Sequence, residues 1–230
     1  MHRIGSFILE EQIGRGGMAQ VWSARHVRQQ VQVAIKVITA QLVKNERHVE
    51  AFRREVQAVA RLSHPNVVRV YDEGIITDEN KRLELIEGAP YFVMEYVPDG
   101  TLESTGGVHS WDQASQILRD LLAALAHAHA CQIIHRDIKP ANVLILRQGV
   151  IPRAKLTDFG ISHVFDPRDA ARQDQQSEHV TGTPRYMAPE QISGNWRDHG
   201  SWTDLYSLGC LAYWLVSGQP PFDAASTFLL

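Results

Sequence analysis

The sequence lacks the features that mark secreted or membrane-spanning proteins. Only two cysteines, Cys131 and Cys210, occur in 230 residues. They lie far apart in apolar, helix-like surroundings, so we expect buried free thiols and a reducing compartment. The longest mostly apolar run, Leu205 to Val216, is too short to cross a bilayer. The first residues lack the apolar core of a signal peptide. These absences predict a cytoplasmic location and no membrane segment in this chain.

An excess of charge of one sign is also missing. The chain carries 23 basic and 26 acidic residues, a net charge of −3, which gives no footprint for general nucleic-acid binding. Eleven histidines occur, but no Cys/His group has the spacing of zinc ligands. His127 and His129 are two residues apart and therefore face different sides of a helix. We expect neither a nucleic-acid partner nor a histidine metal site.

The first forty residues predict strands around a glycine-rich turn. β-branched residues dominate Val31–Ile38, and Val21–Val27 shows partial alternation. The turn Gly14–Gly17, with Ala19, also fits a dinucleotide fingerprint, which needs a following helix and an acidic residue about 20 positions on. A strand-like segment follows instead, and no Asp or Glu occurs from 12 to 45. An ordinary glycine turn and a turn that covers a phosphate both stay open here.

A lysine in an apolar strand and a helix after it favour an anion site. Lys36 ends the run Val33–Lys36, where an unpaired ammonium would be costly. Val49, Phe52, Val56 and Val59 then form an amphipathic helical stripe, which Glu55 borders. A solvated charge is the alternative for Glu55. Two further strands are expected at Val67–Asp72 and Tyr91–Val97, joined by an extended pair with an elaborated loop over Gly74–Pro90.

A long helix and a polar octapeptide follow. Ser110 is a plausible N-cap. The expected buried positions of this helix are Ala114, Ile117, Leu118, Leu121, Leu122, Leu125 and Ala128. His135–Asn142 then places a carboxylate, an ammonium and a carboxamide within six residues, and Asp158–Gly160 follows. Asp137 is suited to orient a hydroxyl, Lys139 to stabilise a phosphate, and Asn142 with Asp158 to offer oxygen ligands to Mg²⁺.

These motifs occur in one order along the chain and resemble those of serine/threonine protein kinases over residues 7–223. Gly182–Glu190 and Asp204–Gly209 complete the set. Lys139 and Gly182–Pro184 indicate a Ser/Thr rather than a Tyr acceptor. The run Met187–Gln191 resembles bacterial members of the family. The resemblance implies an α+β, bilobal fold, with a β-rich N-lobe at about 7–97 and a mainly helical C-lobe at about 98–230.

The resemblance also implies roles for single residues. ATP would contact a set drawn from both lobes: Ile13, Gly14, Gly16, Gly17, Val21, Ala34, Lys36, Glu55, Met94, Glu95, Val97 and Leu144. Asp137 and Lys139 would be catalytic, and Asn142 and Asp158 would hold Mg²⁺. His135 and Phe159 are expected in the core. Protein substrates with Ser or Thr acceptors are implied, as is self-association for autophosphorylation.

The polar stretch Ile161–Val180 is typical of a flexible loop, and the resemblance makes it an activation loop. Arg136 would pair with a phosphate on Ser177 or Thr181, and Thr183 would be structural, near Asp137 and Lys139.

The C-terminal part departs from the family pattern. Thr203–Val216 predicts the central buried helix, with Leu205, Leu208, Ala212 and Leu215 on one stripe. The helices expected to follow are missing, which predicts a truncated C-lobe, a partly uncovered helix and an unpaired Glu190. Two alternatives therefore stand beside an active kinase. One is a pseudokinase that acts as a binding module. The other is a small-molecule phosphotransferase, which Gly182–Glu190 disfavours.

Overall fold

The computed structural model describes residues 2–16, 19–38, 46–77, 83, 85–106, 109–147, 149, 151–159, 184–193 and 196–222. The chain divides into two compact units. Unit 1 comprises Met1–Ser63 and Val68–Val97, and unit 2 comprises His64–Val67 and Pro98–Leu230. The short segment His64–Val67 therefore belongs to unit 2, although it joins two parts of unit 1.

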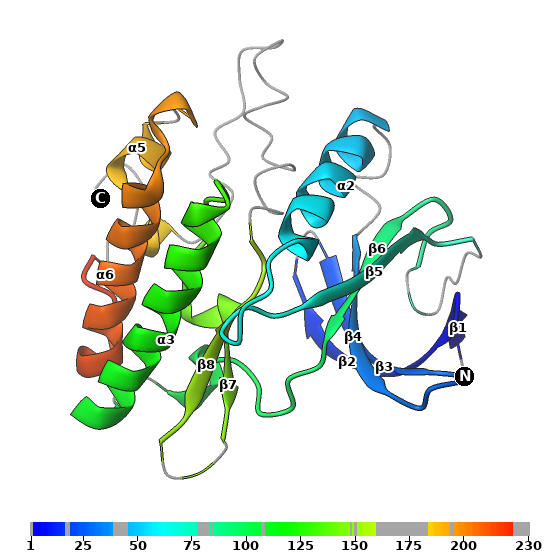
Figure 1. Cartoon of the computed structure of the whole chain (residues 1–230), viewed down its shortest axis with the longest axis horizontal. Helices are drawn as coiled ribbons and strands as arrows, with labels where there is room; N and C mark the ends of the chain where they lie inside the picture. Colours follow the sequence, from blue (N-terminus) through cyan, green and yellow to red (C-terminus); the bar gives the residue numbers. More distant parts are fainter. Residues whose placement is uncertain are drawn as a thin grey trace. The chain divides into compact units, whose positions relative to one another are not determined.

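Unit 1 is built on a six-stranded antiparallel sheet (Figure 1). Its strands are β1 (His2–Ile4), β2 (Phe7–Arg15), β3 (Ala19–His26), β4 (Gln32–Ile38), β5 (Val70–Ile75) and β6 (Pro90–Glu95), in the spatial order β1-β2-β3-β4-β6-β5. The hairpins expected over residues 7–38 are confirmed. Their β-branched and aromatic residues suit a pleated, half-buried surface.

Alternation along the strands separates two faces of this sheet. Val33, Ile35 and Val37 of β4 are buried in one apolar cluster, which also holds Trp22 and Val93. Because successive side chains point to opposite faces, Ala34 and Lys36 lie on the other face.

Helix α2 (Glu46–Ala60) packs on the face that carries Lys36. Phe92 is the cross-strand partner of Lys36, so the two share a face. The Phe52 ring of α2 lies 6.0 Å from the Phe92 ring, centroid to centroid. Phe52, Val56 and Val59 are buried, as the helical stripe predicted. The stripe therefore brings the helix of Glu55 onto the lysine face.

The segment after β5 continues the sheet for a short distance. The Ile76 amide donates to the Ala89 carbonyl at 2.8 Å, and the Gly88 amide donates to the Ile76 carbonyl at 2.9 Å. Ile76 and Leu85 are buried. The extended pair expected in Gly74–Pro90 is confirmed for these residues.

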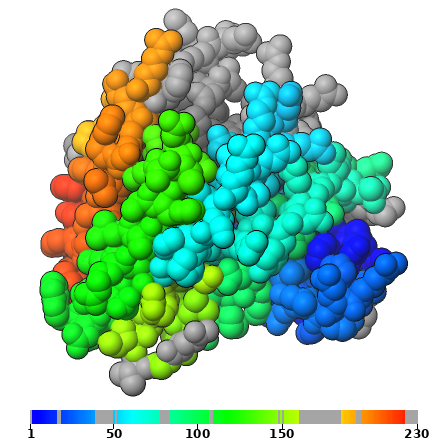
Figure 2. Space-filling view, viewed as in Figure 1, coloured from blue at the N-terminus to red at the C-terminus, as the bar shows by residue number. Residues whose placement is uncertain are grey.

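Unit 2 combines helices with a two-stranded hairpin. Its longer helices, α3 (Trp111–Ala130) and α6 (Ser201–Ser217), contact each other, green and orange in Figure 2, and α3 also contacts β8. The remaining elements are β7 (Val143–Leu146), β8 (Arg153–Leu156), α5 (Pro189–Ile192) and the 3₁₀ helices η1 (Glu103–Thr105), η2 (Pro140–Asn142), η4 (Pro184–Tyr186) and η5 (Trp196–Asp198). No helix in the described ranges is long and apolar enough for a membrane span.

The N-cap of α3 is confirmed, because Ser110 and Gln113 exchange the two bonds of a capping box. Burial was wrongly predicted for two residues. Leu122 is 47% exposed, because it falls at the solvent edge of its helix rather than on the packed stripe. Leu205 is 50% exposed, in agreement with the prediction of a partly uncovered face on its helix. Cys131 is exposed at the C-cap of α3, whereas Cys210 is buried as expected.

Candidate active site

The backbone that leads into the octapeptide is held by one buried carboxylate. Asp204, in the first turn of α6, is fully buried. Its Oδ2 accepts from the His135 amide at 2.9 Å, and its Oδ1 accepts from the Arg136 amide at 2.8 Å. His129 Nε2 lies 2.7 Å from the same Oδ2. Three hydrogen bonds thus satisfy Asp204 and fix the start of the loop.

His135 is a structural residue, as predicted. Its side chain is fully buried, and its ring lies 4.5 Å from the Phe159 ring, centroid to centroid. Nε2 lies 2.8 Å from the Thr157 carbonyl, and Nδ1 accepts from the Asp137 amide at 3.2 Å. A carbonyl can only accept, so the proton belongs on Nε2 and the ring is neutral. The His135 ring thus bridges the Asp137 amide and the Thr157 carbonyl, which immediately precedes Asp158.

Asp137, Lys139 and Asn142 form one hydrogen-bonded group. Lys139 Nζ lies 3.0 Å from Asp137 Oδ1 and 2.8 Å from Oδ2. Asn142 Nδ2 donates to Asp137 Oδ2 at 2.9 Å and to the Asp137 carbonyl at 2.7 Å. Oδ2 therefore receives two donors and Oδ1 receives one. Because an ionised carboxylate oxygen can accept two hydrogen bonds, Oδ1 retains capacity for a further donor.

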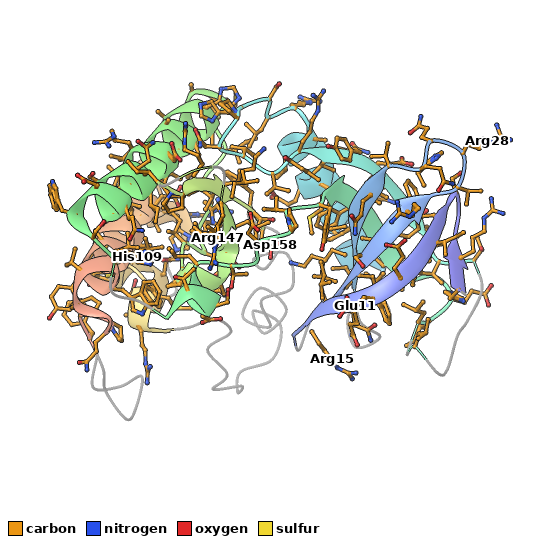
Figure 3. The ribbon with its side chains drawn as sticks, turned by 90° about the horizontal axis from the view of Figure 1, so that it is seen from below. Glu11, Arg15, Arg28, His109, Arg147 and Asp158 are labelled. Atoms are coloured by element: carbon orange, nitrogen blue, oxygen red, sulfur yellow. The ribbon has the colours of Figure 1, made fainter. Side chains whose placement is uncertain are left out.

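The two oxygen donors predicted for magnesium are brought together by the β7–β8 hairpin. The Asn142 carbonyl accepts from the Thr157 amide at 3.0 Å, which places Asn142 beside the residue that precedes Asp158. The side-chain nitrogen of Asn142 donates to Asp137. The Asn142 side-chain atom that could bind a metal ion is therefore Oδ1. Figure 3 labels Asp158 just past the end of β8. Carboxamide and carboxylate oxygens fit Mg²⁺, which takes its other ligands from water and phosphates.

Within the described ranges no group of three His, Cys, Asp or Glu side chains could hold a metal ion by itself. Leu144, implied in adenine binding, lies two residues beyond Asn142 on β7, opposite Lys155 of β8, and is half-buried.

In unit 1 the strand register gathers four of the predicted nucleotide contacts. Val21 is opposite Lys36, and Ala34 is opposite Met94. Ala34 and Lys36 are two residues apart on β4, so all four side chains lie on one face of the sheet. The register thus presents an ammonium beside three apolar side chains. This is the composition expected for a surface that binds a base and its phosphates.

The glycine turn is a β-hairpin whose glycines are not required by internal packing. The Gly16 amide donates to the Ala19 carbonyl at 2.9 Å, and Gly14 is opposite Val21. A Cβ on Gly14 would meet Val21 at 3.5 Å, and one on Gly16 would meet nothing closer than 3.9 Å. Neither glycine has a positive φ. Ile13 of β2 is 45% exposed. Figure 3 labels Arg15 at the end of β2.

The predicted adenine-edge segment has one amide already engaged. The Glu95 amide donates to the Arg69 carbonyl at 2.9 Å. A ligand could therefore hydrogen-bond to the Glu95 main chain only through the carbonyl oxygen. Met94 and Val97 are buried.

Arg136 has an unusual backbone and a partly unsatisfied side chain. Its φ is +66°, a left-handed conformation that costs a non-glycine residue about 1–3 kcal/mol. Its Nε is buried and has no hydrogen-bond partner among the described residues. A buried donor of this kind is suited to an anionic group.

The expectation of a Glu190 without any partner was wrong. The Thr203 hydroxyl donates to Glu190 Oε1 at 2.6 Å, and Thr203 is fully buried in the first turn of α6. Nearby, burial raises the pKa of Tyr186 to about 12, and the charge of Glu103 adds to the increase. The phenol therefore stays protonated at neutral pH.

Several predicted residues lie outside the described residues: Gly17, Gly160, Ser177, Thr181 and Thr183. Sequence reasoning also missed two contacts. His129 bonds Asp204, and Gln191 Nε2 donates to the Arg136 carbonyl at 2.8 Å. His129 could have been noticed six residues before His135, but neither spacing reveals a partner across 55 to 75 residues of chain.

Comparison with known proteins agrees with this geometry. The family described as "Protein kinase domain" matches residues 7–228. The chain is 41% identical to the probable serine/threonine-protein kinase PknB of Bifidobacterium longum over 227 residues, which cover 96% of this chain and 31% of that protein. It is 39% identical to serine/threonine-protein kinase PknB of Mycolicibacterium smegmatis over 224 residues, 96% of this chain and 34% of the relative. The chain thus spans about a third of the length of these relatives. It belongs to the protein kinase family and is similar to its bacterial serine/threonine members.

Proposed function

We propose that this chain transfers the γ-phosphoryl group of ATP to Ser or Thr hydroxyls of proteins. The single observation that carries the proposal is the Asp137, Lys139 and Asn142 group, which leaves Asp137 Oδ1 able to accept a hydroxyl proton. The similarity to bacterial serine/threonine kinases supports the same activity.

The reaction needs little covalent chemistry from the protein. The acceptor oxygen forms a bond to the γ-phosphorus, the bond from that phosphorus to the β–γ bridging oxygen breaks, and ADP leaves. The hydroxyl, held by Asp137 Oδ1, gives up its proton to that carboxylate. Lys139, already against both Asp137 oxygens, places positive charge where the transferring group carries negative charge. Alignment and charge are therefore the main contributions.

Each unit supplies its own proposed contacts for ATP and Mg²⁺. Lys36 is proposed to hold the phosphates, paired with Glu55, and the hairpin amides at Gly14–Gly17 to cover them. The apolar contacts proposed for the base are Ile13, Val21, Ala34, Met94 and Leu144, and backbone groups of Glu95 and Val97 are proposed to hydrogen-bond to its edge, Glu95 through its carbonyl. Asn142 and Asp158 would hold Mg²⁺, which neutralises charge on the phosphates when bound.

We further propose that a phosphate on Ser177 or Thr181 bonds to Arg136. The buried Nε of Arg136 supports this, since a guanidinium binds a phosphate by charge-assisted bonds. Thr183 would remain structural. Self-association for autophosphorylation and a cytoplasmic location are parts of the same proposal. Mass spectrometry of active protein with neither Ser177 nor Thr181 modified would refute the regulatory part.

The test of the activity is a phosphate-transfer assay. The purified chain is incubated with labelled ATP, Mg²⁺ and a generic protein substrate, beside Asp137→Asn. Asn cannot take the proton, so we expect transfer to fall by roughly 10²–10⁴-fold, with label on Ser or Thr. No incorporation by the wild type, with ATP binding retained, would instead favour the pseudokinase alternative.

A further inference from the structure

Gln191, the third residue of α5, links α5 directly to the catalytic loop. It is 8% exposed. Its Oε1 accepts from the Ala188 amide at 3.0 Å, and its Nε2 donates to the Arg136 carbonyl at 2.8 Å. The oxygen of this side-chain amide therefore accepts from the N-cap residue of α5, and its nitrogen donates to the catalytic loop.

The carbonyl that Gln191 contacts belongs to the peptide group immediately before Asp137. The amide of that same peptide group donates to His135 Nδ1 at 3.2 Å. Both polar ends of the Arg136–Asp137 peptide are thus held, one by Gln191 and one by His135. A peptide group is planar, so two such bonds define its orientation. The orientation of that plane sets the direction in which the Asp137 side chain leaves the backbone.

The conformation at Arg136 needs such support. Its φ of +66° is left-handed and strained for a residue with a Cβ. Asp204 holds the amides of His135 and Arg136 before this strained bond, and Gln191 holds the carbonyl after it. Without Gln191 the peptide would lose its donor on the carbonyl side and could rotate toward a relaxed φ and ψ.

We infer that Gln191 is a positioning residue for Asp137. It acts through the Arg136–Asp137 peptide and touches neither nucleotide nor acceptor. The inference rests on the proposed kinase activity. Through it the chain on the α5 side is coupled to the catalytic carboxylate, so that a displacement of α5 shifts Asp137.

The test uses two substitutions with different bonds removed. Gln191→Glu keeps the acceptor for the Ala188 amide but replaces the donor to Arg136 with a second acceptor. Gln191→Met keeps the size and loses both bonds without adding charge. Because small misplacements of reacting groups are costly, we expect kcat to fall by about 10- to 100-fold in both, with the KM for ATP within about twofold of the wild type.

Ser207→Ala is the matched control. The Ser207 hydroxyl is buried and lies 2.7 Å from the Tyr186 carbonyl, to which it donates. Its loss therefore removes a similar buried hydrogen bond in the same unit, and neither partner belongs to residues 135–142. Its kcat should stay near the wild-type value while its melting temperature falls. An equal kcat loss in this control would mean that Gln191 acts only through stability, and would overturn the inference.

Amide hydrogen exchange supplies a readout that needs no activity. The Asp137 amide should exchange faster in both Gln191 variants and unchanged in Ser207→Ala. Wild-type kcat together with wild-type exchange at Asp137 in Gln191→Met would refute the positioning role. Failure of the wild type to transfer phosphate, with faster exchange in the variants, would refute the proposed activity and leave the positioning of Asp137 supported.

Discussion

The catalytic loop of unit 2 and the glycine hairpin of unit 1 are determined in different ways. Asp204 and Gln191 hold the loop by hydrogen bonds from distant parts of the chain, and His135 and Asn142 hold it by hydrogen bonds within the loop. The hairpin around Gly14 and Gly16 is closed by its own strands, and among the described residues no contact closer than 3.5 Å would oppose a Cβ on either glycine. The loop is therefore preorganised by the fold, whereas the hairpin retains space for something outside the protein.

This difference has a physical meaning. A carboxylate that must meet a hydroxyl within a fraction of an ångström benefits from rigid support. Backbone amides that close over phosphates need room for approach, and a Cβ would take that room. The predictions below test this difference, beginning with the largest effect.

The largest effect is expected for Asp204→Ala. Its carboxylate accepts from two loop amides and His129, and removal would leave these buried donors unsatisfied. We expect a loss of about 3–5 kcal/mol in the free energy of unfolding and loss of phosphate transfer. Urea unfolding and the transfer assay measure both. Asp112→Ala is the control, since Asp112 is exposed in the first turn of α3 and should cost less than about 1 kcal/mol.

A network equally dense but distant from the loop should separate stability from activity. Asp120 is 3% exposed and accepts from Gln116 Nε2, the Ala154 amide and, through two nitrogens, Arg153. Asp120→Asn should lower the free energy of unfolding by about 1–3 kcal/mol, because donors would then face an amide. We expect kcat within about twofold of the wild type. A large loss of kcat in Asp120→Asn at unchanged stability would contradict the conclusion that the hydrogen bonds around the catalytic loop are what preorganise it.

Two glycines should give opposite results. Gly16→Ala meets open space, so stability should change by less than about 1 kcal/mol, while the KM for ATP rises by about tenfold, equivalent to 1.4 kcal/mol. Gly74→Ala would place its Cβ 2.6 Å from the Tyr91 ring, which should cost about 1–3 kcal/mol through overpacking and leave the KM for ATP unchanged. Thermal unfolding and ATP titration of the transfer rate compare them. An unchanged KM for ATP in Gly16→Ala would contradict the proposal that the hairpin covers the phosphates.

The smallest effect is a pH dependence at the junction after α2. His64 stacks on His127 of α3 at 5.4 Å between ring centroids, and its Nδ1 accepts from the Asn66 amide at 3.2 Å. Burial lowers the pKa of His64 below 6.5, and the charges of His127 and Lys155 lower it further against the opposing effect of Asp120.

The folded state therefore binds a proton at His64 less readily than the unfolded state. The stabilisation is fully present above pH 6.5 and is lost as the pH falls through the lowered pKa. His127→Tyr keeps an aromatic partner and removes one titrating ring, so its unfolding free energy should decline less between pH 7 and pH 5 than that of the wild type. Equal declines in denaturant titrations would show that the pair does not act in this way.

Prediction from sequence succeeded where short-range patterns decide structure. The strand hairpins follow from β-branched residues with a glycine turn, and α2 follows from the stripe Phe52, Val56 and Val59. Prediction failed at Leu122, because a hydrophobic residue at the edge of a helical stripe has no sequence signal that tells packed from exposed. Glu190 was predicted to be unpaired because the sequence offered no counterpart for the residue that pairs with it in the family. In the structure the hydroxyl of Thr203, thirteen residues away, donates to Glu190.

The sequence by itself determined the kinds of groups available: a lysine in a strand, an Asp-x-Lys-x-x-Asn run, three glycines in a turn and a carboxylate before Phe159. Their order was enough to indicate a protein kinase. Only the tertiary structure decided which atoms meet. The contacts of Asp204 with His135 and of Gln191 with Arg136 join residues 69 and 55 positions apart. Such hydrogen bonds depend on distance and direction in space, which local pattern does not encode.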